Sequence, residues 1–346
     1  MPALERGACS ERGALQRLPE LAWSVPVPNF TTMQTPSSLL RCWFFAAILT
    51  APLLGQINTV QTVVPSVYFH EGDPRRGHSN NGWIVLADFV VVIDANYPSG
   101  AQIVMPKVKE TSDKPVRLVF DTHHHADHAY GNKLWADAGA LLVASSGMLE
   151  EMKLVDSGAF GGAPGRWEAV AEKRPDVAAS KLKPPVMLFP KELVIDDGQT
   201  RIELRTFGWG HTRGDAFAWL PKEKILFTGD ACVNGPHNNV ADGNISEWIK
   251  VLELVKQLGA EKVCPGHGPM GGPEIIADQQ SFFIELQRAV RPLWDQKKTS
   301  ADVKAAANAI GEELKKNPRI ARYVGGAIGS QVQKVWTEFG GEPFPK

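Results

Sequence analysis

The order HxHxDH, directly after a strand-like segment, constrains this chain of 346 residues more than any other feature. Residues 122–128 read THHHADH, and the apolar stretch 116–120 before them is typical of a buried strand. Imidazole and carboxylate ligands together favour zinc or a neighbouring transition metal, whereas calcium and magnesium prefer oxygen ligands alone. The run therefore predicts a metal site at the end of a strand. A histidine-rich surface loop is the alternative.

Alternation along this run separates its side chains into two groups. His123 and His125 lie two residues apart on a chain leaving a strand, so their side chains can point the same way and chelate one ion, while His124 points elsewhere. Asp127 and His128 are then free to reach a second ion. One short loop is therefore expected to contribute to two metal positions.

Three further candidate ligands follow, each beside a glycine at the end of a predicted strand. They are His211 in the segment FGWGHT, Asp230 in ILFTGD and His267 in VCPGHG. Glycine lets the backbone turn sharply and approach an ion without a clashing Cβ atom. A histidine in such a turn is more often structural than ligating, but three such positions after HxHxDH favour a metal site.

These blocks, preceded by a strand that ends in Asp94, resemble the metallo-β-lactamase superfamily of metal-dependent hydrolases from about residue 67 to residue 272. The resemblance implies a first zinc ion held by His123, His125 and His211. It implies a second zinc ion held by Asp127, His128 and His267. Asp230 would bridge the two ions, and Asp94 would orient a metal-bound histidine without binding metal. Iron and manganese are the alternative metals.

The resemblance also implies an α/β fold, a four-layer αββα sandwich with a helical C-terminal tail. Strand-like runs agree with it and cover residues 64–70, 82–93, 116–120, 140–144, 200–207, 216–220, 224–228 and 262–264. The clearest helix is predicted over residues 245–258, capped by Asn244 and ended by Gly259. Residues 57–275 are expected to form the catalytic domain, and residues 276–346 a helical extension that packs on it or forms a dimer surface.

An apolar stretch near the N-terminus predicts export. Residues 1–32 show no periodic pattern, and Met33 opens a segment in which Arg41 precedes the apolar run 42–54. This run is too short to span a membrane but has the length of a secretory signal core. Met33 is therefore the expected start, residues 33–56 a signal peptide, and the periplasm or the medium the destination. A short retained membrane anchor is the alternative.

Charge and cysteine content narrow the function further. A net charge of −1, without a basic run, argues against a nucleic-acid surface, and no stable membrane insertion is expected. Removal of the leader would leave Cys232 and Cys264. They are expected to be buried thiols, or a disulfide in an oxidising compartment, and Cys232 as a metal ligand is a third alternative.

The predicted ligands favour hydrolysis of a small molecule. Two divalent ions that share a water make hydroxide available near neutral pH and polarise the oxygen of the bond that is attacked. Asp127 and Asp230 are the expected catalytic carboxylates, with Asp127 orienting the hydroxide. The expected substrate carries an ester, lactone, thioester or amide carbonyl.

A class B β-lactamase is the closest alternative. Residues 239–248 are similar to the stretch after the second metal motif of those enzymes, in which an asparagine matching Asn239 helps to bind the drug. Asp230 replaces their cysteine and Val233 their lysine, which favours the glyoxalase II, lactonase and esterase branches. The basic residues with which glyoxalase II binds glutathione are not visible. A mononuclear iron redox enzyme and a non-catalytic metal-binding module are alternatives of other classes.

Two loops are candidates to shape the pocket. Residues 72–82 lie where this family often has a flap, and Arg75, Arg76 and His78 could contact an acidic substrate group or form a solvated turn. Residues 157–165, rich in glycine around Phe160, are a second candidate for a mobile loop.

Overall fold

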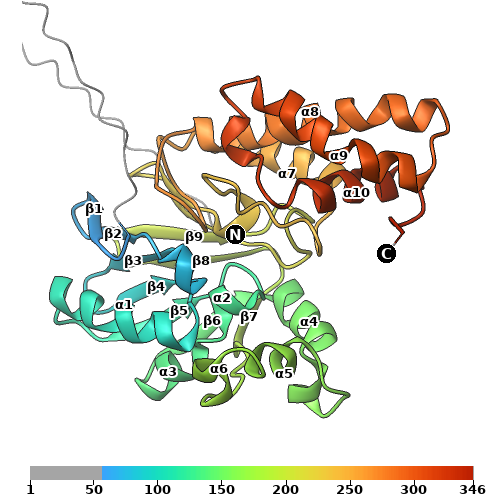
Figure 1. Cartoon of the computed structure of the whole chain (residues 1–346). Coiled ribbons are helices and arrows are strands. Elements are labelled where there is room, and N and C mark those ends of the chain that lie inside the picture. The colour runs from blue at the N-terminus through green and yellow to red at the C-terminus, as the bar shows by residue number, and fades with distance from the viewer. Residues whose placement is uncertain (1–56, 346) are drawn as a thin grey trace, which may run out of the picture. The chain divides into compact units, whose positions relative to one another are not determined.

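The computed structural model describes residues 57–345, which form two β-sheets with helices on both outer sides (Figure 1). The first sheet follows the chain order β1 (Val60–Val64), β2 (Val67–His70), β3 (Asn81–Val85), β4 (Val90–Ile93), β5 (Val116–Phe120), β6 (Leu141–Ser145) and β7 (Met187–Phe189). The pairs from β1 to β4 are antiparallel, and those from β4 to β7 are parallel.

The second sheet has the order β12 (Lys262–Cys264), β11 (Ile225–Phe227), β10 (Phe217–Leu220), β9 (Arg201–Arg205) and β8 (Glu192–Asp196). Its pairs are antiparallel except for β11 with β12. Because β5, β11 and β12 all end in short turns that carry predicted ligands, the ends of these strands position the candidate site.

Helices cover the outer face of each sheet, with the earlier ones on one side of Figure 1 and the orange and red ones on the other. The first group comprises α1 (Pro98–Thr111), α2 (Ala126–Ala129), α3 (Asn132–Asp137), α4 (Ser146–Val155), α5 (Arg166–Ala171) and α6 (Pro175–Ala178). The second comprises α7 (Ile245–Lys256), α8 (Glu274–Asp295), α9 (Ser300–Lys315) and α10 (Ile328–Glu338). Single 3₁₀ turns are η1 (Pro74–Arg76), η2 (Ser157–Phe160), η3 (Gly229–Ala231) and η4 (Ala321–Tyr323).

Alternation along β4 shows how the four layers arise. Val91 and Ile93 face the second sheet and join its inner side chains in one core, while Val90 and Val92 face α1 and α3 in another. Successive strand residues point to opposite faces, so a strand that is apolar throughout is buried on both sides. A third core joins the outer face of the second sheet to α7–α10. The predicted four-layer sandwich is therefore confirmed.

The strand predictions were accurate where the flanking signals were strong and wrong where two strands meet in a tight turn. Residues 116–120 and 262–264 are strands as predicted, but residues 82–93 are the two strands of the β3–β4 hairpin. A turn centred on Ser66, whose φ is 71°, likewise separates β1 from β2. Apolar residues on both sides of each turn concealed it. Strands β7 and β8 were not predicted, since each is a sheet edge with exposed apolar side chains.

Helix α7 begins at Ile245 as the sequence predicts and ends at Lys256, two residues before the predicted end. The Asn244 side chain accepts a hydrogen bond from the Glu247 backbone N–H at 2.9 Å, which satisfies one of the free N–H groups of the first turn. The helix ends before Gly259, whose φ of 70° favours glycine.

The C-terminal helices share a continuous core with α7. Phe282 and Phe283 of α8 and Trp336 of α10 belong to the same buried cluster as Trp248 of α7. Helix α8 begins at Glu274, so it crosses the expected boundary between residues 275 and 276. The division into a catalytic domain and an extension stays a prediction.

Several predictions concern the N-terminal segment and the cysteines. The expected start at Met33 and the signal peptide over residues 33–56 lie outside the described residues. Among residues 57–345, no helix combines the length and apolar character needed to cross a membrane. Cys232 and Cys264 are buried free thiols, and burial raises the pKa of both. Of the alternatives expected for these two cysteines, the structure has the buried thiols.

Candidate metal centre

The predicted ligands meet where the strands of both sheets end on the same side of the molecule. The loop after β5 and the first turn of α2 carry four of them, namely His123, His125, Asp127 and His128. The other three lie in turns next to β10, β11 and β12, namely His211, Asp230 and His267. Seven side chains that span 145 residues of sequence, from 123 to 267, therefore lie in one cluster.

Glycines beside these ligands allow the close approach that the sequence predicts. A Cβ atom at Gly266 would clash with Asp230 Oδ1, and one at Gly229 would clash with the Thr122 hydroxyl. Gly229 also has a φ of 50°, in the left-handed region that suits glycine. Gly266 therefore lets the turn that carries His267 pack against the Asp230 turn, and Gly229 lets the Asp230 turn pack against Thr122.

The first ligand set comprises His123, His125 and His211, with Asp230 at its side. Each of the four offers one nitrogen or oxygen atom, and these atoms all lie within 4.8 Å of one another. His125 Nδ1 faces His211 Nε2 at 2.8 Å, and His123 Nε2 is buried without a hydrogen-bond partner. Buried polar atoms are normally paired. Convergent imidazole nitrogens with an unpaired member fit a divalent metal ion.

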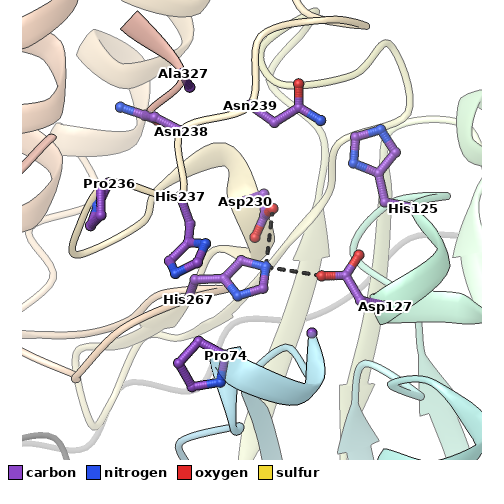
Figure 2. Close-up of a pocket in the computed structure, with 11 residues that line it drawn as sticks. Pro74, His125, Asp127, Asp230, Pro236, His237, Asn238, Asn239, His267 and Ala327 are labelled. Atoms are coloured by element: carbon purple, nitrogen blue, oxygen red, sulfur yellow. Dashed lines mark ion pairs between the residues drawn. The ribbon is translucent and has the colours of Figure 1, made fainter. Parts of the chain in front are cut away.

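The second set comprises Asp127, His128 and His267, whose ligand atoms also lie within 4.8 Å of one another. His267 Nε2 is 3.0 Å from Asp127 Oδ2 and 3.5 Å from Asp230 Oδ2, as the dashed lines of Figure 2 mark. His128 Nε2 and Asp230 Oδ1 lie 3.3 Å apart, and both are buried without a hydrogen bond. This mixed nitrogen and oxygen set also fits a divalent transition metal.

Asp230 lies between the two sets. Its Oδ1 faces His128, while its Oδ2 lies 3.5 Å from His267 Nε2 and 3.7 Å from His211 Nε2. One carboxylate therefore reaches histidines of both sets, which is the geometry that the predicted bridging role requires.

Burial and neighbouring charges give the histidines of the two sets different proton affinities. Burial and the surrounding imidazoles lower the pKa of His123 well below its usual range, and burial together with His125 lowers that of His211 to about 3. Burial also opposes the charged form of the second set, but Asp230 and the carboxylates near it raise the pKa of His128 well above its usual range and that of His267 to about 10. These shifts favour the protonated forms of His128 and His267 at neutral pH in the metal-free protein.

Carboxylates behind the ligands orient them. Asp94 Oδ2 lies 2.8 Å from His128 Nδ1, and Asp94 Oδ1 accepts hydrogen bonds from the backbone N–H and hydroxyl of Thr122 at 2.8 and 2.9 Å. The Thr122 hydroxyl also lies 3.1 Å from His123 Nδ1. Asp94 thus occupies the orienting position that the resemblance implies, and through Thr122 it contacts both sets.

Asp242 orients the first set, a role that the sequence did not reveal. Its Oδ2 lies 2.8 Å from His125 Nε2 and accepts a hydrogen bond from Arg166 Nη2 at 2.7 Å. The His124 imidazole 3.6 Å away, the hydrogen-bonded His125 and Arg166 together hold the pKa of the Asp242 carboxyl well below its usual range. His124, His125 and Asp242 are close enough to form a third ligand group. Because Arg166 already neutralises Asp242, we assign this carboxylate as a hydrogen-bond partner and not as a ligand.

A cavity of about 400 Å³ opens beside the cluster (Figure 2). His125, Asp127, Asp230 and His267 form its polar floor. Residues far apart in the sequence form its walls, among them Pro74, Gly77, Pro236, His237, Asn238, Asn239 and Ala327. The ring of His237 stacks on that of His267 with centroids 5.2 Å apart. A substrate in this cavity would meet Asp127, whose side chain is 22% exposed.

Of the two residues predicted to contact substrate, Asn239 lines the cavity and His78 does not. Asn239 is exposed and lines the cavity. His78 does not line it, because its side chain is buried against α1 and its Nε2 lies 2.9 Å from the Ser99 hydroxyl. The predicted substrate contact of His78 is therefore wrong. Its neighbour Arg75 has an 83% exposed side chain and matches the solvated-turn alternative.

Val233 lies in the core and not at the cavity. Its side chain is fully buried, and its backbone N–H donates to Gln279 Oε1 at 2.7 Å. The position that matches the β-lactam-binding lysine is thus turned away from the site, and α8 holds it there. Residues 157–165 contribute nothing to the cavity lining.

The comparisons with known proteins agree with this geometry. A family model described as "Metallo-beta-lactamase superfamily" matches residues 74–267. A protein of Bacteroides fragilis named "Metallo-beta-lactamase type 2" is 33% identical over 107 residues, which are 29% of this chain and 43% of that protein. The "Hydroxyacylglutathione hydrolase" of Rhodobacter capsulatus is 24% identical over 251 residues, 69% of this chain and 81% of that protein.

Solved structures show the same fold. The structure named "Metallo-beta-lactamase from Pontibacter korlensis" aligns with a TM-score of 0.52 at 20% identity, covering 65% of this chain and 98% of that chain. The DIM-1 metallo-beta-lactamase exposed to ceftazidime aligns with a TM-score of 0.50 at 19% identity, covering 64% and 94%. About a third of this chain thus lies outside the shared fold.

Proposed function

The chain belongs to the metallo-β-lactamase superfamily, and on that premise we propose that it is an exported zinc-dependent hydrolase of esters, lactones, thioesters or amides. The family and the relatives named above make it a metal-dependent hydrolase. The observation that carries the proposal is the position of Asp230 between two convergent ligand sets. That arrangement supports two metal ions per chain, at His123, His125 and His211 and at Asp127, His128 and His267.

Asp127 is the residue best placed to act on the reacting water. Bound divalent ions would supply hydroxide near neutral pH and polarise the carbonyl oxygen under attack. Burial opposes the charged form of Asp127, but His128 and His267 lower its pKa to about 2, so the carboxylate is ionised and can accept a hydrogen bond from the water. Its partly exposed oxygens can orient the water and then pass the proton to the leaving group. Asp94 and Asp242 hold His128 and His125 in place meanwhile.

The cavity wall supports a substrate with an uncharged acyl group. Asn239 offers an amide to a carbonyl oxygen, and Pro236 and Ala327 add apolar surface. Asn239 also favours β-lactam hydrolysis as the second candidate function. The burial of Val233, where a carboxylate-binding lysine would be needed, supports the ester, lactone and thioester classes over it.

The test is a panel of p-nitrophenyl esters, lactones, thioesters and nitrocefin offered to the zinc-loaded full chain and to Asp127→Ala. We expect turnover of at least one acyl substrate and a loss of roughly a hundredfold or more in the variant. Wild-type turnover in Asp127→Ala would contradict the mechanism. Turnover of nitrocefin alone would move the assignment to the second candidate.

Export rests on the apolar segment 42–54 after Arg41. We expect the protein, expressed with its own N-terminus in a Gram-negative host, to be recovered from the periplasm with a new N-terminus near residue 56. Recovery of the uncleaved chain from the membrane fraction would support the retained anchor instead.

A further inference from the structure

One wall of the cavity belongs to a loop without regular secondary structure, residues 234–243, which we call the pocket loop. It carries His237, Asn238 and Asn239, which line the cavity, and Asp242, which holds His125. A loop that contacts both substrate and a ligand histidine must be held in place for the site to keep its shape.

Helix α10 holds this loop through three side chains on one face. Gln331 Nε2 donates to the Asn238 carbonyl at 2.8 Å, and Lys334 Nζ donates to the Ala241 carbonyl at 3.3 Å. The Glu338 carboxylate accepts from the backbone N–H groups of Ile245 and Ser246 at 2.7 and 3.1 Å. The spacing 331, 334 and 338 is that of neighbouring positions on one helical face. Helix α10 therefore binds the loop in its middle, near its end and at the start of α7.

Gln331 is the central contact. Its side chain is fully buried, and so is Asn238, whose carbonyl accepts the hydrogen bond. Loss of the donor would leave that carbonyl without this buried partner, which costs more than the loss of an exposed hydrogen bond. Gln331 therefore helps to fix the position of residues 237–239 in the pocket loop.

The segment that leads into α10 also touches the cavity. Ala327 lines it directly. Gly325 packs against Pro236 of the pocket loop so closely that a Cβ atom at residue 325 would lie 2.6 Å from the proline Cβ. The C-terminal helices thus contribute both a surface of the cavity and the support of its neighbouring wall.

We propose that α10 is a positioning element of the active site, in which Gln331 holds the pocket loop for substrate binding and Ala327 limits the size of the acyl group. The inference rests on the proposed hydrolase function. It assigns specificity to residues beyond 267, where the match to the family model ends. Gln331 touches no metal ligand directly and bonds Asn238, which lines the cavity, so its largest effect should fall on substrate binding.

The test compares Gln331→Met with Gln333→Met in the full zinc-loaded chain. Methionine keeps the length of glutamine but cannot donate a hydrogen bond. Gln333 lies on the same helix and its side chain accepts a hydrogen bond from the Phe344 backbone N–H at 3.2 Å, away from the pocket loop, so Gln333→Met is the matched control. We expect Gln331→Met to raise KM about tenfold, the effect of one buried hydrogen bond. We expect zinc content and kcat to change less than KM, because Gln331 reaches the ligand histidines only through the pocket loop.

A readout without turnover separates this inference from the proposed function. Amide hydrogen exchange over residues 234–243 should become about tenfold faster in Gln331→Met and stay unchanged in Gln333→Met. Equal exchange in both variants would overturn the positioning role, even if the enzyme is active. If the wild type hydrolyses nothing in the panel, the proposed function fails while the exchange result still decides the role of α10.

If Gln331→Met does not fold, Ala327→Leu tests the proposal through its second part, the limit on the size of the acyl group. Residue 327 is partly exposed with ordinary backbone angles, so a larger side chain can extend into the cavity. We expect the kcat/KM ratio of acetyl to hexanoyl esters to rise about tenfold, the discrimination that a few methylene groups allow. An unchanged ratio would show that the segment before α10 does not limit the acyl group.

Discussion

The two ligand sets contain the same kind of side chain in opposite electrostatic surroundings. His123 and His211 face other imidazoles, and burial keeps them neutral. His128 and His267 face carboxylates that favour their charged forms. Metal binds neutral imidazole, so His123 and His211 are ready for an ion while His128 and His267 must release protons first. The difference shows that residue type alone does not determine how a metal site loads.

The largest effect on this contrast is expected from Asp230, because its two carboxylate oxygens lie beside histidines of both sets. We expect Asp230→Asn to lower kcat/KM by about a thousandfold, within the range for loss of a positioned catalytic carboxylate, and to reduce the zinc bound at each set. The measurements are steady-state kinetics and metal analysis. Asp137→Asn, at an exposed carboxylate paired with Lys133, is the surface control. A variant that loses zinc from one set alone would refute the bridging role.

Proton release on zinc binding tests the contrast directly. At pH 7 His267, with a pKa of about 10, and His128 carry protons that zinc must displace, whereas His211, with a pKa of about 3, carries none. Affinity at the second set should therefore fall by roughly tenfold or more per unit as pH decreases from 8 to 6, more steeply than affinity at the first set. Calorimetric titrations of the metal-free protein in buffers of different ionisation enthalpy count the protons. Equal release in both binding steps would contradict this account.

Asp94 and Asp242, the carboxylates behind the ligands, provide a matched pair of variants that tests which ligand set each of them supports. Asp94 contacts His128, and Asp242 contacts His125. Each change to asparagine removes the charge and keeps the shape, and asparagine tolerates the φ of 62° at residue 94. We expect Asp94→Asn to weaken zinc at the second set and Asp242→Asn at the first, each by roughly tenfold. The check is competition for zinc with a chromophoric chelator. Loss at the same set in both variants would mean that the outer contacts are not specific.

Asn239 should show the smallest effect, because it touches neither set of ligands through its side chain. Its amide lines the cavity, and its Oδ1 accepts from the Ala241 backbone N–H at 3.0 Å. We expect Asn239→Ala to raise KM by roughly fivefold, the effect of one hydrogen bond to substrate, with kcat nearly constant. A fall in kcat with constant KM would place Asn239 in the bond-breaking step instead.

The ligand set was predictable because its members share local signals. HxHxDH follows a buried strand, and His211, Asp230 and His267 each follow a glycine at a strand end, so chain order and strand ends suffice to propose one cluster. The same reasoning failed at His78. Residues 72–82 have the composition of a flexible loop. That composition does not reveal that the His78 imidazole packs against Ser99 and away from the substrate.

Residues that act across elements had no such signal. Arg166 of α5 reaches Asp242 from 76 positions away, and Gln331 reaches Asn238 from 93 positions away. Neither spacing is a property of a strand or a helix. Both contacts depend on how separate helices pack on the sheets.

The sequence by itself determined the candidate ligands and their order, because turn glycines and ligand chemistry are local properties, and through the family resemblance these motifs implied the four-layer fold and the bridging place of Asp230. Only the tertiary structure decided how the two sets differ: burial and nearby charge lower the pKa of His123 and His211 and raise that of His128 and His267, and packing brings α10 to the pocket loop. Electrostatic and packing interactions depend on the distances between residues that are far apart in the sequence, and folding alone sets those distances.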